Sequence, residues 1–306
     1  MSEDRVLFKI EDNIAHVTLN RAEKRNALDM SMFKAIDDIS RQLRRDRKIR
    51  AVIVTANGED FCSGLDVKSV LSQRSSALSL LAKWLPGRAN LAQRVSVNWR
   101  KIPVPVIMVI QGRCWGGGLQ IALGADFRIA SGDSSFSIME GKWGLIPDMG
   151  GNLAIRELVP KDIALRLTMT AEVISAQTAL EYGLVTQLAE KPLDEAMHLA
   201  NLVAERSPDA VAALKKLYHQ NWFKAEWKML AKWLPGRANL AQRVSVNWRK
   251  IPVPVIMVIQ GRCWGGGMQI ALGADFRIAS PDASFSIMEG KWGLIPDMGG
   301  NLAIRE

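Results

Sequence analysis

A near-verbatim internal repeat constrains this chain more than any other feature. Residues 81–157 recur at residues 230–306 with a constant offset of 149. The copies differ at three pairs of positions: Leu119/Met268, Gly132/Pro281 and Ser134/Ala283. Solenoid repeats are shorter units, about 20 to 50 residues long, that diverge while they keep a pattern. We therefore interpret the repeat as a recent or engineered duplication of one long block.

Composition describes a chain with a core and excludes several classes of protein. The 306 residues are 48% hydrophobic and 23% charged, so a sizeable core is expected. A net charge of +9 is compatible with nucleic acid, a membrane surface or a phosphorylated group, and does not choose among them. Three cysteines and three histidines are too few and too dispersed for a disulfide framework or a metal site. With a charged N-terminus and no long apolar run, we expect a reduced, metal-free, cytoplasmic protein without signal peptide or membrane helix.

The hydrophobic pattern predicts an α/β core. Alternation over residues 5–10 and 14–19 predicts a β-hairpin, and Asp29 can cap the helix that follows. Short apolar runs at residues 51–55 and 105–110 are typical of strands buried on both faces. Residues 150–229 have a helical pattern throughout. Strands that alternate with helices, followed by helices alone, indicate an α/β fold with a C-terminal helical region.

Two strand-to-helix turns expose backbone N–H groups. One ends in Ser63–Asp66, and the other is the triple glycine Gly116–Gly118, after which a helix is expected. Glycines let a ligand approach the main chain, and the first N–H groups of a helix have no internal partner. A carbonyl oxygen that reached both turns would meet an oxyanion hole. The alternative is that the glycines serve only a tight turn or close helix packing.

Two carboxylates lie eight residues apart in the segment FSIMEGKWGLIPDMGG. Gly144 and Pro147 between them make a helix unfavourable, so Glu140 and Asp148 can both turn inward from a loop. The alternative is structural: Asp148 would cap the helix that starts near Gly150, and Glu140 would be a solvated surface charge.

Together these segments resemble the enoyl-CoA hydratase/isomerase family, the crotonase superfamily. The motifs are NRAEKRNAL, AVIVTANGEDFCSGLDVK, PVIMVIQGRCWGGGLQIALGADFRIA and FSIMEGKWGLIPDMGG, in family order, and the resemblance covers about residues 5–222. It implies a crotonase-like spiral of ββα units with a C-terminal helical region, and trimers or dimers of trimers. It also implies an acyl-CoA thioester as substrate, with coenzyme A as part of that substrate and no separate cofactor.

Site residues follow from the same resemblance. The backbone N–H groups of Leu65 and Gly117 would bind the thioester oxygen and stabilise an enolate. Coenzyme A would run along residues 25–27, the segment at Lys68 and the glycines of the two turns. We expect contacts from Arg25, Ala27, Lys68, Gly64 and Gly116.

The acid/base pair departs from the hydratase pattern. A hydratase of this family uses two glutamates, and Gln120 stands at the position of the first. Glu140 matches the second, while Asp148 matches an aspartate found in isomerases that act on dienoyl-CoA. We therefore expect an isomerase rather than a hydratase, in which Glu140 and Asp148 move protons with pKa values raised by an apolar pocket. The alternative is a catalytically silent acyl-CoA or RNA binding protein of the same fold.

A run of cations ends the first predicted helix. Its members are Arg41, Arg44, Arg45, Arg47, Lys48 and Arg50. Such a run can bind RNA, but no aromatic residues interleave with it, and cations at a helix C-terminus complement the helix dipole. We favour the structural role, so nucleic acid is not expected as a partner.

The second copy cannot build a complete site alone. It contains Gly266, Glu289 and Asp297, but no counterpart of Leu65 precedes it. Loss of the first copy from the core would strand residues 158–229, which need it to pack. We therefore predict a core at 1–190, a helical segment at 191–229, and a copy at 230–306 that is appended, loosely folded or swapped into a neighbouring subunit.

Overall fold

The computed structural model describes residues 4–71, 89–221, 247–248, 251–253, 255–274 and 276–292. Met1–Ala204 forms one compact unit and Glu205–Glu306 forms another, so helix α10 (Pro208–Asn221) belongs with the second copy. None of the helices in these ranges is long and apolar enough to cross a membrane.

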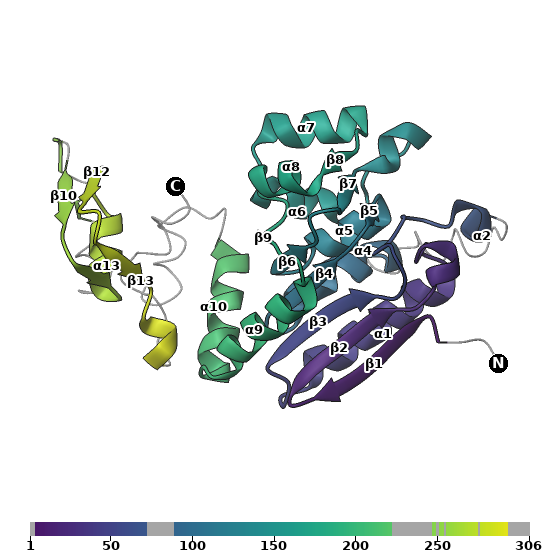
Figure 1. Ribbon diagram of the computed structural model, residues 1–306, viewed down its shortest axis with the longest axis horizontal. Helices are drawn as coiled ribbons and strands as arrows, with labels where there is room; N and C mark the ends of the chain where they lie inside the picture. The colour runs from purple at the N-terminus through teal and green to yellow at the C-terminus, as the bar shows by residue number, and fades with distance from the viewer. Residues whose placement is uncertain are drawn as a thin grey trace. The chain divides into compact units, whose positions relative to one another are not determined.

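A six-stranded sheet forms the centre of the first unit, with strand order β1-β2-β3-β4-β6-β9 (Figure 1). The strands are β1 (Val6–Glu11), β2 (Ile14–Leu19), β3 (Ala51–Ala56), β4 (Val106–Ile110), β6 (Phe127–Ala130) and β9 (Gln187–Leu188). The first pair is the predicted hairpin, and Asp12 and Asn13 turn it with φ values of 48° and 63°. The other pairs are parallel, as expected for strands joined through helices.

Helix α1 (Met30–Arg45) begins where the sequence predicts it. The Asp29 side chain accepts a hydrogen bond of 2.8 Å from the Met32 N–H, which satisfies one of the orphan donors of the first turn. Its apolar face, including Phe33 and Ile36, is fully buried against the sheet. Arg44 and Arg45 lie in the last turn, where positive charge is favourable.

A second, three-stranded sheet carries the segments with candidate chemistry. It has the order β5-β7-β8, formed by β5 (Arg113–Trp115), β7 (Ser135–Ser137) and β8 (Ile174–Ser175). Helix α5 (Gly117–Leu123) follows β5, and the 3₁₀ helix η3 (Met139–Trp143) follows β7. The helix begins at Gly117, earlier than the start predicted after Gly118, because the turn is completed by Gly116 alone.

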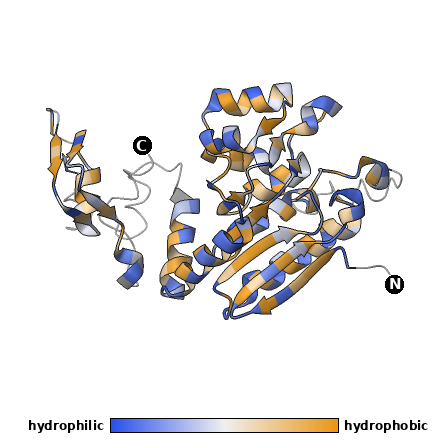
Figure 2. Cartoon of the chain, in the orientation of Figure 1, coloured by the Kyte–Doolittle hydropathy of each residue, from blue (hydrophilic) through white to orange (hydrophobic). Residues whose placement is uncertain are grey.

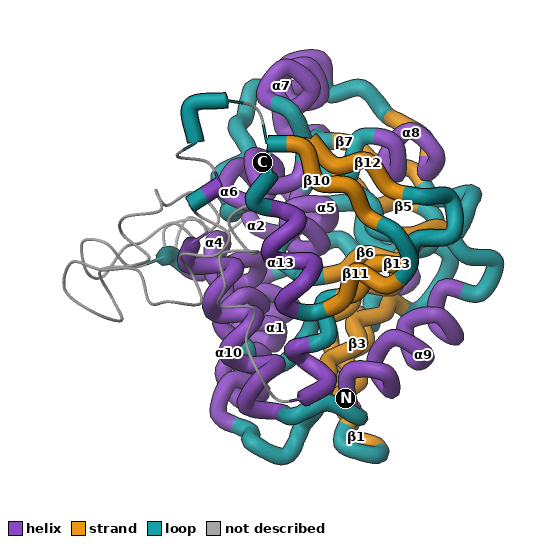
Figure 3. The backbone as a smooth tube through the Cα atoms, turned by 90° about the vertical axis from the view of Figure 1, so that its left-hand side faces the viewer, coloured by secondary structure: helices purple, strands orange, loops and turns teal. Residues whose placement is uncertain are grey.

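The remaining helices cover the two sheets. They are α2 (Val67–Leu71), α4 (Leu91–Val97), α6 (Gly151–Leu158), α7 (Lys161–Thr170), α8 (Ala176–Glu181) and α9 (Pro192–Ala204), with short 3₁₀ turns η1 (Ala22–Lys24) and η2 (Asn98–Lys101). Helix α9 lies against β3, β4 and β6, where Ala196 and Ala200 complete a buried apolar layer. Figure 3 shows α9 beside β3. The predicted α/β class with a C-terminal helical region is therefore confirmed.

The second copy repeats the local structure of the first. Its elements are β10 (Ile256–Ile259), β11 (Arg262–Trp264), α13 (Gly266–Leu272), β12 (Phe276–Ala279), β13 (Ser284–Ser286) and the 3₁₀ helix η5 (Glu289–Trp292). Strands β10 and β12 pair in parallel, as do β11 and β13, in the registers of their counterparts. One sequence thus gives one local fold in both places.

One of the three substitutions removes a hydrogen bond from the second copy. In the first copy the hydroxyls of Ser131 and Ser134 are 2.9 Å apart and bonded to each other. Ala283 replaces the second serine, and the hydroxyl of Ser280 is buried with no hydrogen-bond partner among the described residues. An unsatisfied buried hydroxyl costs roughly 1–3 kcal/mol, so Ala283 removes a stabilising contact that the first copy keeps.

Candidate active site

The first turn of the site is fixed by pairing with the segment after η1. The Leu28 N–H donates to the Gly64 carbonyl at 2.8 Å, and the Asp66 N–H donates to the Leu28 carbonyl at 3.0 Å. These two bonds make an isolated parallel bridge between Leu28 and Leu65. In a parallel bridge the N–H of the central residue faces the opposite side, so the Leu65 N–H points away from Leu28.

The second turn depends on close approach of main chain to main chain. Gly116 has φ 51° and starts the turn into α5, and its N–H donates to the Ser137 carbonyl at 2.8 Å. A Cβ added at Gly118 would lie 2.6 Å from the Cβ of Cys62, closer than real Cβ atoms come. Glycine is therefore required here to let α5 pack closely on the segment around Cys62, which leads to the first turn.

The structure brings the two turns together. A Cβ added at Gly64 would lie 3.6 Å from the Gly117 nitrogen and 3.3 Å from the Trp115 carbonyl oxygen. Within the described part of the chain, neither the Leu65 N–H nor the Gly117 N–H donates to a protein acceptor. Two backbone N–H groups without a protein acceptor among the described residues therefore lie on adjacent turns.

Glu140 lies at the edge of this pair of turns. A Cβ added at Gly116 would be 3.6 Å from Glu140 Oε1, and that oxygen accepts a hydrogen bond of 2.6 Å from the Gln120 amide. The other carboxylate oxygen, Oε2, is buried without a hydrogen-bond partner among the described residues. Burial raises the pKa of Glu140, the negative charge of Asp148 adds to the increase, and the Gln120 amide opposes it. Glu140 is therefore no solvated surface charge.

Gln120 is a buried link between Glu140 and the loop that follows it. Its side-chain oxygen accepts hydrogen bonds from the N–H groups of Met149 at 2.9 Å and Gly151 at 3.1 Å. Because backbone N–H groups can only donate, the amide oxygen must face them and the NH₂ group must face Glu140. Gln120 is 1% exposed, so water does not compete for these bonds.

Asp148 is placed differently from Glu140. It is exposed, and helix α6 is capped by Gly150 without a side-chain bond, so the capping alternative for Asp148 is wrong. The loop between the two carboxylates presents Trp143, Leu145 and Ile146 to solvent with exposed fractions of 72%, 53% and 74%. Asp148 thus acts on Glu140 through its charge, beside an exposed apolar loop.

Comparison with known proteins decides the family. A sequence model of the enoyl-CoA hydratase/isomerase family matches residues 9–233 and residues 237–305. The chain belongs to the enoyl-CoA hydratase/isomerase family. Over 214 residues it is 33% identical to the (E)-benzylidenesuccinyl-CoA hydratase of Thauera aromatica, covering 69% of this chain and 80% of that protein. Over 209 residues it is 33% identical to the carnitinyl-CoA dehydratase of Proteus mirabilis, covering 67% and 77%.

Solved structures support the same assignment. The enoyl-CoA hydratase of Mycobacterium smegmatis superposes with a TM-score of 0.68 at 25% identity, over 75% of this chain and 88% of that one. The enoyl-CoA hydratase of Bacillus anthracis gives 0.66 at 26% identity, over 74% and 87%. The predicted crotonase-like fold is confirmed, and the chain is an acyl-CoA enzyme of the hydratase/isomerase type.

Four of the five residues expected to contact coenzyme A lie in or beside the first turn, and the fifth, Gly116, is in the second. The Arg25 carbonyl accepts a hydrogen bond of 3.0 Å from the Ser63 N–H, which joins the segment containing Arg25 and Ala27 to the loop ending at Leu65. Arg25 and Lys68 are both exposed, and Arg25 Nε is 3.9 Å from a carboxylate oxygen of Asp60. Two cations near one turn suit phosphate groups.

Two buried residues that the sequence analysis missed hold the first turn in place. Arg21 is 7% exposed, donates to the Ala27 carbonyl at 2.8 Å and pairs with Asp66 at 2.8 Å. Asn26 is fully buried and donates to the carbonyls of Asn57 and Asp60 at 2.9 and 2.8 Å. Asn26 also has φ 53°, a conformation that asparagine tolerates better than most residues. Both residues lie in the motif NRAEKRNAL. The polar residues of this motif were therefore the sequence signal for the contacts that hold the first turn.

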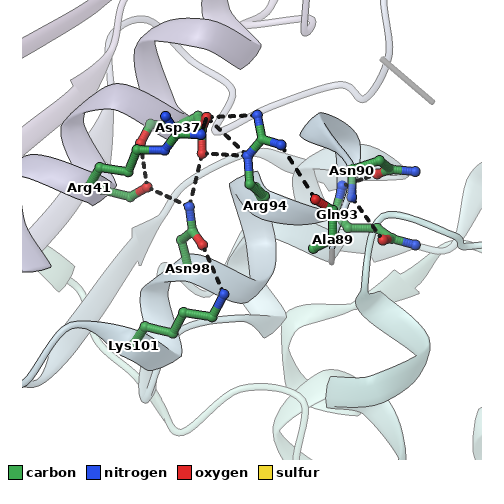
Figure 4. A network of polar contacts seen from close by, with 9 residues as sticks. Asp37, Arg41, Ala89, Asn90, Gln93, Arg94, Asn98 and Lys101 are labelled. Atoms are coloured by element: carbon green, nitrogen blue, oxygen red, sulfur yellow. Dashed lines mark hydrogen bonds and ion pairs between the residues drawn. The ribbon is translucent and has the colours of Figure 1, made fainter. Parts of the chain in front are cut away.

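An ion pair between the buried Asp37 and the partly buried Arg94 joins α1 to α4 (Figure 4). Asp37 of α1 accepts hydrogen bonds of 3.0 and 2.9 Å from Arg94 of α4, and Asn98 adds one of 3.0 Å. On the same helix, the Ser96 hydroxyl donates to the Gln120 carbonyl at 2.7 Å. Helix α4 therefore connects α1 to the helix that carries the Gly117 N–H and Gln120.

The predicted cation run is partly used for structure. Arg41 pairs with Asp37 at 2.8 Å, and Arg50 donates to the Ala204 carbonyl at 2.7 Å, at the C-terminus of α9.

The cysteines are free and buried, and burial raises the pKa of Cys62 to about 12, so its thiol is protonated at neutral pH. Across the described ranges, no group of three or more His, Cys, Asp or Glu is placed to hold a metal ion. Asp297 and the segment 72–88 lie outside the described residues.

Proposed function

We propose that this enzyme moves a proton on an acyl-CoA thioester through an enolate, and that isomerisation of a dienoyl-CoA is favoured over hydration. The observation that carries the proposal is the contact between the two turns and Glu140. The free N–H groups of Leu65 and Gly117 would bind the thioester oxygen, whose charge grows as the α-proton leaves. The phosphates of coenzyme A would lie near Arg25 and Lys68, with the backbone of Ala27, Gly64 and Gly116 alongside.

Glu140 is the proposed base. Oε2 of Glu140 has no hydrogen-bond partner among the described residues and is available to accept a proton. The raised pKa of Glu140 is closer to the pKa of a thioester α-proton than the pKa of an ordinary glutamate is. The Gln120 amide holds Oε1 and so selects which oxygen reacts. After proton removal, Glu140 or Asp148 would return a proton at a different carbon, which is an isomerisation.

Gln120 is the reason to favour isomerisation. Hydration needs one group to activate water and another to deliver a proton to the α-carbon. An amide side chain is neither an acid nor a base near neutral pH, so Gln120 supplies neither function. Glu140 and Asp148 remain, and because Asp148 matches an aspartate of dienoyl-CoA isomerases, this pair favours proton transfer between two carbons.

The names of the relatives favour a second candidate, reversible addition of water to a 2-enoyl-CoA. Both curated relatives described above are named as a hydratase or a dehydratase. In this reaction Glu140 would activate the water molecule, and the enolate would again be held by the two N–H groups. A silent acyl-CoA or RNA binding protein remains the non-catalytic alternative, since Gln120 removes one acid/base group.

Ultraviolet absorbance against time with a 3,5-dienoyl-CoA and, separately, a short 2-enoyl-CoA distinguishes these candidates. We expect conversion of the dienoyl substrate, abolished in Glu140→Gln and retained in Glu289→Gln, the same substitution in the second copy. Conversion of the 2-enoyl substrate alone would establish hydration instead. Inactivity with both, together with retained thioester binding, would support the silent protein.

A further inference from the structure

The second copy exposes an apolar face whose counterpart residues are buried in the first copy. Ile256, Val258, Phe276 and Ile278 line one side of the paired strands β10 and β12, with exposed fractions of 58%, 75%, 59% and 59%. We call these four residues the β10–β12 face. Figure 2 shows hydrophobic colouring along both strands. The opposite side of the same strands packs on α13 through Ile259 and Ala271.

The first copy shows what such a face requires. Ile107, Val109 and Ile129, the counterparts of three of the four residues, have exposed fractions of 0%, 5% and 1%. They are covered by α9 through Ala196 and Ala200, in one layer with Ile53 of the neighbouring strand β3. In the first copy the same face is therefore one side of a buried interface, and α9 forms the other side.

Two glycines of the second copy lack the close neighbours that their counterparts have in the first copy. A Cβ added at Gly118 would clash with Cys62, whereas one added at its counterpart Gly267 would meet no described atom within 4 Å. A Cβ added at Gly112 would clash with Glu59 and Asp60, whereas one added at its counterpart Gly261 would meet no described atom within 4 Å. Among the described residues, nothing fills the space around these two glycines that Glu59, Asp60 and Cys62 fill in the first copy.

Each chain has one β3 and one α9 but two blocks that fit against them. If residues 230–306 took the place of residues 81–157 against β3 and α9, in the same chain or in a second chain, one of the two blocks would still be uncovered in every chain. Such an exchange therefore buries no additional apolar surface. Contact between two uncovered blocks does bury it. Because both blocks have the same sequence, such contact is self-complementary under a two-fold axis.

We propose that the second copy is an association surface, on which the β10–β12 face packs against the same face of a second copy of this chain. Each sheet already has α13 on its other side, so the pair forms two stacked sheets between two helices, with the usual spacing of about 10 Å between sheets. The association is independent of the proposed function. It applies in addition to any trimer that the first unit forms.

Measurement of molar mass in solution tests the proposal with full-length variants. In Val258→Lys/Ile278→Lys two charges oppose burial of the face. We expect the wild type to have twice the molar mass of this variant at equal concentration. The control Leu7→Lys/Ile10→Lys alters apolar residues of β1 with exposed fractions of 43% and 42%, and should keep the wild-type mass. Equal masses for the wild type and the β10–β12 variant would overturn the proposal.

A cross-link gives a readout that does not depend on tolerance of buried charge. Oxidation of Val258→Cys at micromolar concentration should give a disulfide-linked dimer, because the two faces bring these residues within reach. Leu7→Cys should give much less. Equal dimer yields at the two positions would contradict the proposal. A doubled mass without a Val258→Cys dimer would also contradict it and would favour exchange of blocks under α9.

Discussion

The Gln120 amide donates a hydrogen bond of 2.6 Å to Glu140 Oε1 while its oxygen accepts from the N–H groups of Met149 and Gly151. One side chain therefore fixes the orientation of the proposed base and the course of the loop behind it. The second copy repeats the bond between Gln269 and Glu289. A duplicated pair in one chain offers matched controls for substitutions at the site.

Gln120→Glu should change the balance between the two candidate reactions. Two carboxylates at this separation cannot both be ionised, so they would share a proton, and the pair would gain a group that can donate one. Because a positioned acid or base contributes on the order of 10²-fold or more, hydration of a 2-enoyl-CoA should rise by about that factor relative to isomerisation. The measurement is the ratio of the two rates for each variant. Gln269→Glu, the same change in the second copy, should leave the ratio unaltered, and an equal effect of both substitutions would contradict the assignment of the site to the first copy.

Asp148→Asn should move the acid limb of the activity profile to lower pH. Glu140 must be ionised to act as a base, so activity falls as the pH drops through its pKa. The negative charge of Asp148 helps to raise that pKa, and its removal lowers it. The pH dependence of kcat/KM reports this shift for the free enzyme. Asp133→Asn, in an exposed turn, is the control, and an acid limb that moves to higher pH in Asp148→Asn would refute the electrostatic role.

Gly64→Ala should abolish most of the activity without preventing folding of the core. The added methyl group would lie 3.6 Å from the Gly117 nitrogen, in the space where the thioester oxygen is expected, and the φ of 104° is unfavourable for alanine. A decrease in kcat of about 10²- to 10³-fold is expected, as for loss of an oxyanion donor.

The chain supplies a neutral control for this substitution. A Cβ at Gly132 would meet no described atom within 4 Å, and the second copy already carries Pro281 at the equivalent position. Gly132→Ala should therefore match the wild type. Near-normal kcat in Gly64→Ala would mean that the thioester oxygen lies elsewhere.

Arg94→Met should destabilise the first unit. It would leave Asp37, whose side chain is 4% exposed, without its bidentate partner. Asp37 keeps its contacts with Arg41 and Asn98, so we expect the free energy of unfolding to fall by about 2 kcal/mol, as for loss of a hydrogen bond to a charged group. Urea unfolding followed by fluorescence gives the change. Lys9→Met, which breaks an exposed pair with Glu11, should shift the midpoint by no more than the experimental error, and equal shifts in both variants would show that the Asp37 pair contributes little.

The sequence predicts those parts of the structure that depend on neighbouring residues. The hairpin, the Asp29 cap and the buried strands follow from periodicity and capping within short windows, and the triple glycine marks the second turn. The family resemblance then points to Leu65, Gly117 and Glu140, which the fold brings together around Gly64 and Gly116.

The parts that were not predicted depend on contacts between distant segments. Asn26 is bonded to carbonyl groups 31 and 34 residues away, and no local pattern specifies such partners. The capping alternative for Asp148 was plausible from spacing, but Gly150 in a left-handed conformation begins the helix instead. The exposed face of the second copy likewise follows from what the rest of the chain lacks, since its own sequence matches a buried block.

Exchange of the α-protons of a saturated acyl-CoA with deuterium, followed by proton NMR in D₂O, tests the central claim most directly. It requires only binding of the thioester oxygen and removal of a proton, whatever the later steps are. We predict exchange catalysed by the wild type and by Glu289→Gln, and loss of at least about 10²-fold in Glu140→Gln. Exchange at the wild-type rate in Glu140→Gln, or absence of exchange in a wild type that binds the thioester, would contradict the account.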